Sequence, residues 1–159
     1  MPTPLVPIIL GSKADLDHAR AITSVLDAFG IEHQTRIASA HKATRYLLNL
    51  LAEYEQSGRA LVYITVAGRS NALSGVVDAN VTAPVIACPP YSDRFGGMDI
   101  LSSLRMPSGL GALVVLEPEA AAIAAAKILS LADPSLTGRV KEYQEKSRRK
   151  IEEDDAAMQ

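Results

Sequence analysis

The sequence has very few of the residues that build metal clusters and aromatic cores. It contains a single cysteine, Cys88, no tryptophan, and only 4% aromatic residues. One cysteine excludes an internal disulfide and a cysteine-rich metal site. We therefore expect an aliphatic, alanine-rich core, in which Cys88 is a buried and unreactive thiol because it closes an apolar run.

Long apolar runs are also missing. No stretch approaches the roughly 18 residues of a membrane-spanning helix, and the start of the chain lacks the charged and apolar segments of a secretory signal. The formal net charge of −2 gives no general attraction to nucleic acid or to anionic membranes. The basic residues 146–150 are followed by the acidic residues 152–155, which indicates a solvated helix face. These absences predict a cytoplasmic protein that binds neither nucleic acid nor membrane.

The remaining composition is that of an ordinary globular protein. The chain has 159 residues, of which 48% are hydrophobic and 21% are charged. A chain of this length buries enough surface to form one packed core. Because no internal repeat or low-complexity linker divides it, we predict a single domain over residues 1–159.

Short apolar runs alternate with segments of helical periodicity along the whole chain. This alternation predicts parallel strands joined by right-handed crossover helices. The predicted fold class is α/β, a three-layer α/β/α sandwich with a parallel, flavodoxin-like sheet and a long C-terminal helix. The expected strands are residues 6–10, 31–37, 60–67, 85–88 and 113–116, the second being polar enough for a sheet edge. The expected helices are residues 15–29, 46–54, 71–79, 100–104, 119–132 and 136–155.

Polar loops follow the predicted strands, at the edge where parallel sheets bind their ligands. After the first strand, Gly11 permits close backbone approach, and Ser12 with the first amides of the next helix can hold a phosphate. Asp15 can accept hydrogen bonds from ribose hydroxyls. An ordinary strand-to-helix turn, with Asp15 as the helix cap, is the alternative interpretation.

The second loop brings a hydroxyl, an imidazole and an ammonium group together in the run Ser-Ala-His-Lys at residues 39–42. A cation at this edge suits a phosphate, and an imidazole suits acid–base chemistry. A lone histidine is nevertheless more often structural than catalytic. The other two histidines, His18 in a helix and His33 in the edge strand, are expected at the surface.

Three further segments are more polar or more constrained than simple connections. In residues 67–75 glycines bracket polar side chains at a helix start, for which a capped helix is the simpler interpretation. Residues 88–90 read Cys-Pro-Pro, and residues 102–109 read Ser-Ser-Leu-Arg-Met-Pro-Ser-Gly. No Ser-His-Asp order, phosphate-binding Gly-x-x-x-x-Gly-Lys motif or paired-histidine spacing is present, so we predict no metal site.

Taken in order, the five motifs from Gly11 to Gly109 resemble those of the aminoimidazole ribonucleotide carboxylase family. One branch of that family, the mutases, moves a carboxyl group from the carbamate nitrogen of N-carboxyaminoimidazole ribonucleotide to a ring carbon. The other branch adds free carbon dioxide to the same carbon. Mutases typically carry arginine where this chain has Lys42, and a second histidine in the loop after the third strand. That loop here lacks histidine, so the resemblance is to the carboxylase branch.

The resemblance implies reversible carboxylation of aminoimidazole ribonucleotide in de novo purine biosynthesis, without ATP, a metal or any other cofactor. The implied partners are the small-molecule ribonucleotide, carbon dioxide and further copies of the chain in a homo-octamer. His41 would be the catalytic acid–base. The implied substrate-binding residues are Gly11, Ser12, Asp15, Ser39, Ala40, Lys42, Gly68, Arg69, Ser70 and Asn71. One departure is Ala14, because the family usually has a serine there.

Two other functions stay open at this point. The first is the mutase activity, and the second is a non-catalytic, flavodoxin-like nucleotide-binding module, which fold alone does not exclude. Arg69 also has a structural alternative, a salt bridge to a neighbouring subunit. The alanine-rich helix 119–132 and the sparsely apolar helix 136–155 independently favour burial in an oligomer.

Overall fold

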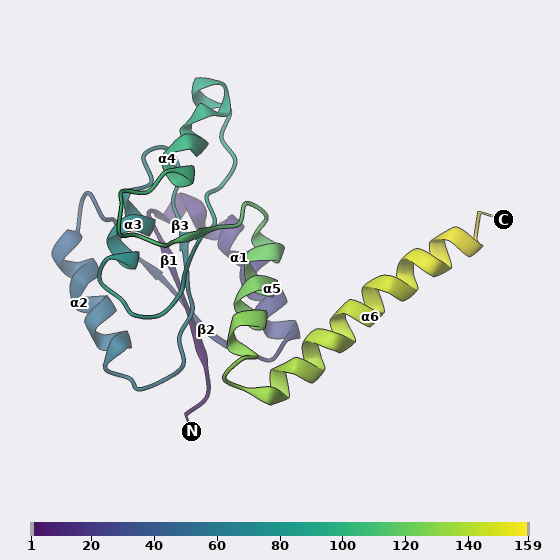
Figure 1. Cartoon of the computed structure of the whole chain (residues 1–159). Coiled ribbons are helices and arrows are strands. Elements are labelled where there is room, and N and C mark those ends of the chain that lie inside the picture. Colours follow the sequence, from purple (N-terminus) through teal and green to yellow (C-terminus); the bar gives the residue numbers. More distant parts are fainter. Residues whose placement is uncertain (1, 159) are drawn as a thin grey trace.

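The computed structural model describes residues 2–158 as a parallel β-sheet with helices on both faces (Figure 1). The strands are β1 (Leu5–Leu10), β2 (Glu32–Ile37), β3 (Tyr63–Val66), β4 (Val85–Ala87) and β5 (Leu113–Val114). The α-helices are α1 (Leu16–Ala28), α2 (Thr44–Glu55), α3 (Ala72–Asp78), α4 (Leu101–Leu104), α5 (Pro118–Leu129) and α6 (Pro134–Ala156). Two 3-10 segments are η1 (Lys13–Asp15) and η2 (Arg94–Ile100).

Neighbouring strands all run parallel, in the order β2-β1-β3-β4-β5. β1 is an interior strand whose residues are all buried, whereas β2 lies at the edge and has only exposed and half-buried residues. A strand covered on both faces must be apolar throughout, which explains why the most continuous apolar run lies inside the sheet. This topology confirms the predicted α/β class, the flavodoxin-like sheet and the polar edge strand.

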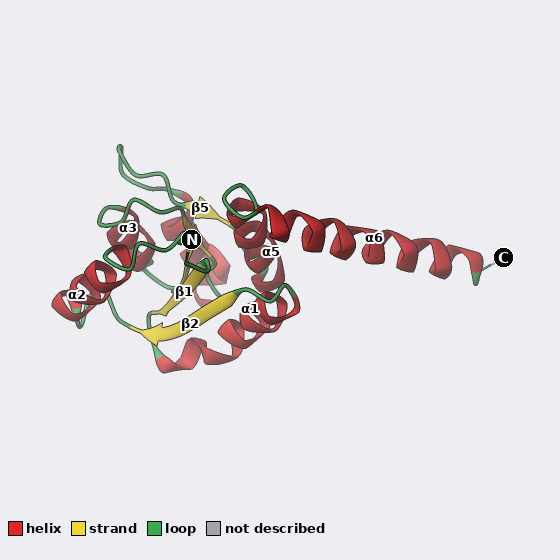
Figure 2. Cartoon of the chain, turned by 90° about the horizontal axis from the view of Figure 1, so that it is seen from below, coloured by secondary structure: helices red, strands yellow, loops and turns green. Residues whose placement is uncertain are grey.

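Alternate residues of β1 enter two separate cores. Val6, Ile8 and Leu10 pack with α1, α5 and the start of α6, while Leu5 and Ile9 pack with α2 and α3. Figure 2 shows α1 and α5 on the opposite side of the strands from α2 and α3. The predicted three-layer sandwich is therefore confirmed. The fully buried alanines that let α5 pack closely against the first core are Ala121, Ala122, Ala125 and Ala126.

Several strands are shorter than their apolar runs. The run at residues 60–67 forms a ladder only over β3, because Leu61 makes just an isolated bridge with Leu5. The run at residues 113–116 pairs only over β5. In both cases one further backbone hydrogen bond lies beyond the ladder, from Val62 to Leu5 and from Val115 to Ala87, and both valines pack against the first core.

The beginning of α6 packs on the chain's own core, which corrects the expectation that this helix is explained mainly by a neighbouring subunit. Leu136 and Val140 are buried, and the ring of Tyr143 lies 5.3 Å from that of Phe29. The remainder projects away from the domain (Figure 1), and Ile151 is 69% exposed. Although α6 has 23 residues, no helix within residues 2–158 is both long and apolar enough to cross a membrane.

A projecting segment between β4 and β5, residues 91–106, is here called the arm. It contains η2 and α4 and rises beyond the carboxyl ends of the strands, at the top of Figure 1. Phe95, Gly96 and Gly97 all have positive φ, which turns the chain sharply at the tip. Its large exposed apolar side chains are Tyr91, Phe95, Met98, Leu101 and Leu104.

Candidate active site

An open cleft of about 760 Å³ lies beyond the carboxyl ends of β1, β2 and β3. This is the position at which open parallel sheets bind ligands, where the strand order changes direction between β1 and β3. The cleft brings together all of the predicted site residues except Asn71. Those that line it are Gly11, Ser12, Asp15, Ser39, Ala40, His41, Lys42, Gly68, Arg69 and Ser70.

The first loop is a tight turn closed by Asp15. One carboxylate oxygen of Asp15 accepts both the amide and the hydroxyl of Ser12, at 3.0 and 3.1 Å. Gly11 donates its amide to the carbonyl of Val66 at 2.9 Å, and a Cβ at this position would lie 3.3 Å from that of Ala67. The Ser12–Asp15 hydrogen bonds close the strand-to-helix turn and both residues line the cleft, but the Asp15 side chain makes no capping hydrogen bond to α1.

The second loop presents two cation-forming groups at the mouth of the cleft. The hydroxyl of Ser39 accepts the amide of Lys42 at 3.2 Å, and its carbonyl accepts the amide of Ala43 at 3.0 Å. Ala40 is buried beneath this turn, while His41 and Lys42 are exposed. Within residues 2–158 the imidazole of His41 forms no hydrogen bond, so both of its nitrogens are available to a ligand.

The third loop divides into exposed and buried parts. Gly68, Arg69 and Ser70 form part of the cleft wall, and Arg69 has a left-handed backbone with φ of 59°. Asn71, in contrast, is only 4% exposed. Its carbonyl oxygen caps α3 by accepting the amide of Ser74. The capped-helix interpretation is therefore correct for Asn71, whose side chain lies away from the cleft wall.

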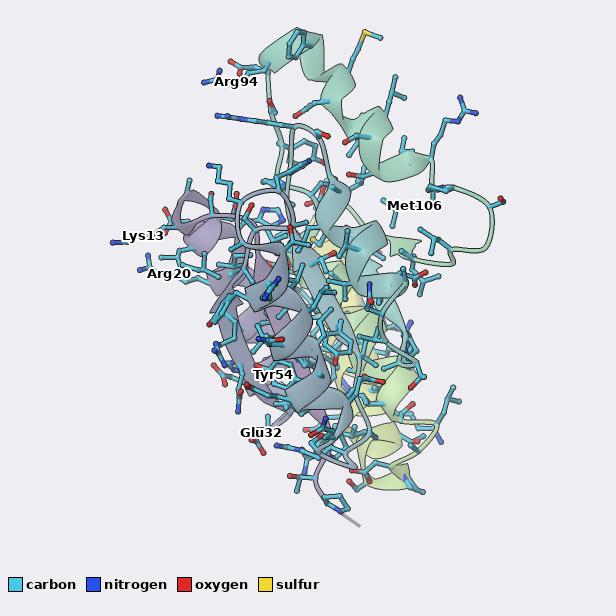
Figure 3. All side chains as sticks on the ribbon, turned by 90° about the vertical axis from the view of Figure 1, so that its left-hand side faces the viewer. Lys13, Arg20, Glu32, Tyr54, Arg94 and Met106 are labelled. Carbon is cyan, nitrogen blue, oxygen red and sulfur yellow. The ribbon has the colours of Figure 1, made fainter. Side chains whose placement is uncertain are left out.

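The arm supplies a side of the cleft that sequence patterns did not reveal. Tyr91, Ser92, Asp93, Arg94 and Asp99 all line the cleft. Figure 3 shows Arg94 at the end of the arm and Met106 at its base, on the same end of the molecule as Lys13 of the first loop. The available signal was the polar, glycine-containing segment that follows Cys-Pro-Pro between two strands.

A smaller cavity of about 290 Å³ adjoins the cleft beneath the arm. It is lined by Pro89, Gly97, Ile100 and Leu116, and it shares Gly68 and Asp99 with the larger cleft. The arm and the third loop thus form walls of both spaces.

Neither remaining histidine is a freely exposed surface residue, which corrects the expectation for both. His18 is half-buried, with Nε2 3.3 Å from the sulfur of Cys88, and burial lowers its pKa although the Asp15 carboxylate opposes this shift. His33 contacts a carboxylate oxygen of Asp27 at 3.0 Å. Sequence periodicity did not reveal these contacts because both partners lie on neighbouring elements.

The burial predicted for Cys88 is confirmed. The residue has no exposed surface, and its thiol lies between His18 and the carbonyl of Leu116. Burial, reinforced by the charge of Glu117, raises the pKa of the thiol to about 12. The reactive thiolate form is therefore scarce at neutral pH.

The family model for AIR carboxylase matches residues 5–150. The chain belongs to the AIR carboxylase family. It is 53% identical to the phosphoribosylaminoimidazole carboxylase of Treponema denticola over 155 residues, 98% of each chain. It is 56% identical to that of Archaeoglobus fulgidus over 144 residues, 91% of this chain and 79% of that one.

A crystal structure of Treponema denticola PurE is also closely similar. It matches with a TM-score of 0.96 and 52% identity, covering 98% of this chain and 99% of that chain. Together with the family match, this likeness makes the chain a carboxylase-type enzyme of purine biosynthesis. The interpretation as a non-catalytic flavodoxin-like module is therefore wrong.

The environment of Cys88 predicts an unreactive thiol in this AIR carboxylase family member. At pH 8 we expect a chromogenic disulfide reagent to label the native enzyme about a hundredfold or more slowly than the unfolded chain. Because the sequence has one cysteine, absorbance reports this site alone. Labelling of the native enzyme at the rate of the chain in denaturant would contradict the prediction.

Proposed function

We propose that this enzyme adds dissolved carbon dioxide to aminoimidazole ribonucleotide, reversibly and without ATP, to form carboxyaminoimidazole ribonucleotide. The single observation that carries the choice of donor is the third loop. Arg69 and Ser70 stand in the cleft wall, and no histidine lies between Gly68 and Gly75. The mutase alternative uses a second histidine in this loop, and Lys42 also departs from the mutase pattern.

The first two loops favour the phosphate and ribose of the substrate. Ser12, Ser39 and Lys42 lie together in the cleft and offer hydroxyls and a cation, which suit a phosphate. Asp15 lies beside them and accepts hydrogen bonds, which suits ribose hydroxyls. Ala14 also lines the cleft, so phosphate binding relies on these groups without a second loop hydroxyl.

The third loop is then left for the base and the carboxylate. Gly68, Arg69 and Ser70 form another part of the cleft lining. The exposed guanidinium of Arg69 suits a carboxylate, to which it can donate two parallel hydrogen bonds. Asn71 does not line the cleft, because its side chain is buried and hydrogen-bonded to Ser74 and Ser103, so we assign it no direct contact with the substrate.

The reaction needs a proton acceptor but no activating cofactor. The aminoimidazole ring is an enamine, so the carbon beside its amine-bearing carbon attacks carbon dioxide directly. A carbon–carbon bond forms, one carbon–oxygen π pair becomes the carboxylate charge, and the ring carbon keeps its hydrogen. Removal of that proton restores aromaticity, and in the reverse direction the same group returns it.

His41 is the histidine that fits this role. It lines the cleft and its imidazole is exposed toward the cleft mouth. His18 is half-buried beside Cys88, and His33, on the edge strand, contacts Asp27 of α1. An imidazole exchanges protons near neutral pH, which suits both directions of the reaction.

We also propose that the chain assembles into a homo-octamer. The support is the exposed apolar set on the arm, including Phe95 at 86% and Met98 at 63% exposure, and the projecting part of α6. Exposed apolar groups that are clustered in this way favour burial by other copies. In this arrangement the arms lie beside the clefts, so assembly and activity are coupled.

Replacing His41 with Asn should lower kcat by about a hundredfold to ten-thousandfold, the usual contribution of a positioned acid or base. The KM for the ribonucleotide should change little, because the phosphate contacts lie on other residues. Lys42→Ala is the matched control on the adjacent residue, and it should raise KM with a smaller change in kcat. Steady-state kinetics in both directions measures the difference. Near-normal kcat in His41→Asn would remove this residue from the mechanism.

The carbon donor is identified by following the first seconds of reaction. Carbon dioxide and bicarbonate interconvert slowly, so a carbon dioxide user shows a burst with dissolved gas and a lag with bicarbonate. Carbonic anhydrase should abolish the difference. Freshly made N-carboxyaminoimidazole ribonucleotide is supplied in a parallel reaction. Faster conversion of this isomer than of free carbon dioxide at matched concentration would mean that the enzyme is a mutase.

Light scattering should give a particle of about eight times the 16.9 kDa chain mass. A stop codon after Lys146 removes the projecting part of α6 and keeps the packed residues Leu136, Val140 and Tyr143. This variant should retain its fold by circular dichroism while losing assembly and activity together. A stable monomer in the full-length chain, or full activity of a monomeric variant, would contradict the proposed coupling.

A further inference from the structure

Two residues of the arm form hydrogen bonds with the backbone amide and the backbone carbonyl of Arg69 in the third loop. The backbone amide of Arg69 donates to a carboxylate oxygen of Asp99 at 3.1 Å. The carbonyl of the same residue accepts the hydroxyl of Ser102 at 2.9 Å. That hydroxyl also accepts the amide of Asn71 at 3.0 Å. Asp99 and Ser102 thus bind the loop across 30 and 33 residues of sequence.

The residue that is held in this way has an unfavourable backbone conformation. Arg69 has φ of 59°, in the left-handed region that residues with a Cβ rarely adopt. Such a conformation persists only where its surroundings impose it, and it is most common at functional sites. Here the surroundings that contact the Arg69 peptide directly are the side chains of Asp99 and Ser102.

The base of the loop is fixed independently of Asp99. Thr65, Ser74, Asn71 and Ser103 form a continuous chain of hydrogen-bonded side chains from β3 to α4, with distances of 2.8 to 3.0 Å. All four are buried, Asn71 being the most exposed at 4%. Loss of the Asp99 contact therefore releases the exposed end of the loop without unfolding its base.

Asp99 itself stands at the cleft rather than in the core. It is half-buried and lines both the large cleft and the adjoining cavity. Within the described residues its carboxylate forms no ion pair, and its hydrogen bond is to a backbone amide. Its contribution is thus to hold the loop backbone, for which an oxygen acceptor is needed and a negative charge is not.

We propose that Asp99 is a positioning residue for carboxylation, which holds Arg69 in its left-handed conformation and so places Gly68, Arg69 and Ser70 around the reacting carboxylate. This inference rests on the proposed function of the third loop. Because the ribose phosphate contacts lie on the other two loops, loss of Asp99 acts on the chemical step and leaves binding of the ribonucleotide nearly intact.

The test compares Asp99→Ala, which removes the acceptor, with Asp99→Asn, which keeps a side-chain oxygen. We expect Asp99→Ala to lower kcat by about tenfold to a hundredfold, the scale on which misplacement of a positioning group by about 1 Å slows a reaction, with KM changed by less than about threefold. Asp99→Asn should recover most of this loss. Exchange of backbone hydrogens, measured by mass spectrometry, should be faster in peptides that contain Arg69. We expect this change in Asp99→Ala and not in Asp99→Asn.

Asp78 provides a matched control at the end of α3, outside the lining of the cleft. Its carboxylate also accepts one backbone amide from a distant loop, that of Gly111 at 2.8 Å. Asp78→Ala should leave kcat and the exchange of Arg69 unchanged. If Asp99→Ala does not fold, Ser102→Ala removes the second contact of Arg69, and its slower turnover and faster exchange of Arg69 would support the proposal in its place.

Several outcomes would overturn the inference. Equal losses in Asp99→Asn and Asp99→Ala would assign the effect to charge, and equal losses in Asp78→Ala would make it a general effect on stability. Unchanged exchange at Arg69 in Asp99→Ala would show that the loop does not depend on this residue. Failure of the proposed function is seen separately, as a wild-type enzyme that converts only the N-carboxy isomer, and the variants are then compared on that substrate.

Discussion

The pairing of β1 with β2 and β3 is the interaction on which the site depends. Leu10, the last residue of β1, is in register with Ile37 on one side and Val66 on the other. The three strands therefore end level, and the three polar loops begin at one edge of the sheet. A slip of one residue would turn buried side chains toward the wrong face and displace one loop by about 3.3 Å. Complete burial of β1 thus sets the geometry of the cleft.

Local sequence patterns were sufficient for the strands, the longer helices and the positions of the loops. Apolar runs identify buried strands, and Gly30, with φ of 61°, follows α1 as a helix-ending glycine should. They were insufficient where a distant partner decides the direction of a side chain. Asn71 turns inward toward Ser103, 32 residues away, and His18 turns toward Cys88, 70 residues away. Period and composition contain no information about such pairs.

The arm shows the same limit for the backbone. Its tip depends on positive φ at Phe95, a residue type for which sequence gives no reason to expect that conformation. Its contribution to the cleft through Asp99 follows from a contact with Arg69, 30 residues earlier. The motifs indicated that this segment was constrained, but only the structure shows what it contacts. The sequence therefore predicted the part of the cleft that is formed by the loops after β1, β2 and β3. It did not predict the part that is formed by the arm.

The polar residues of the three loops divide into those that close a turn and those that face the cleft. Each loop is closed by a hydrogen bond between residues three positions apart. These bonds join Ser12 to Asp15, Ser39 to Lys42 and Asn71 to Ser74. A motif residue can therefore shape its loop without lining the cleft, as Asn71 does.

This division matters most for a reaction that has no cofactor to supply activation. When a nucleophilic ring and carbon dioxide need only be held together and relieved of one proton, the catalyst contributes mainly position. Correct positioning in turn requires that the side chains facing the ligand are attached to rigid backbone. The exposed His41 lies within the turn that the Ser39–Lys42 hydrogen bond closes, and the exposed Arg69 is held by the arm beside a buried chain of hydroxyl and amide groups. The side chains that face the cleft are thus available to a ligand, because hydrogen bonds of neighbouring residues fix the backbone that carries them.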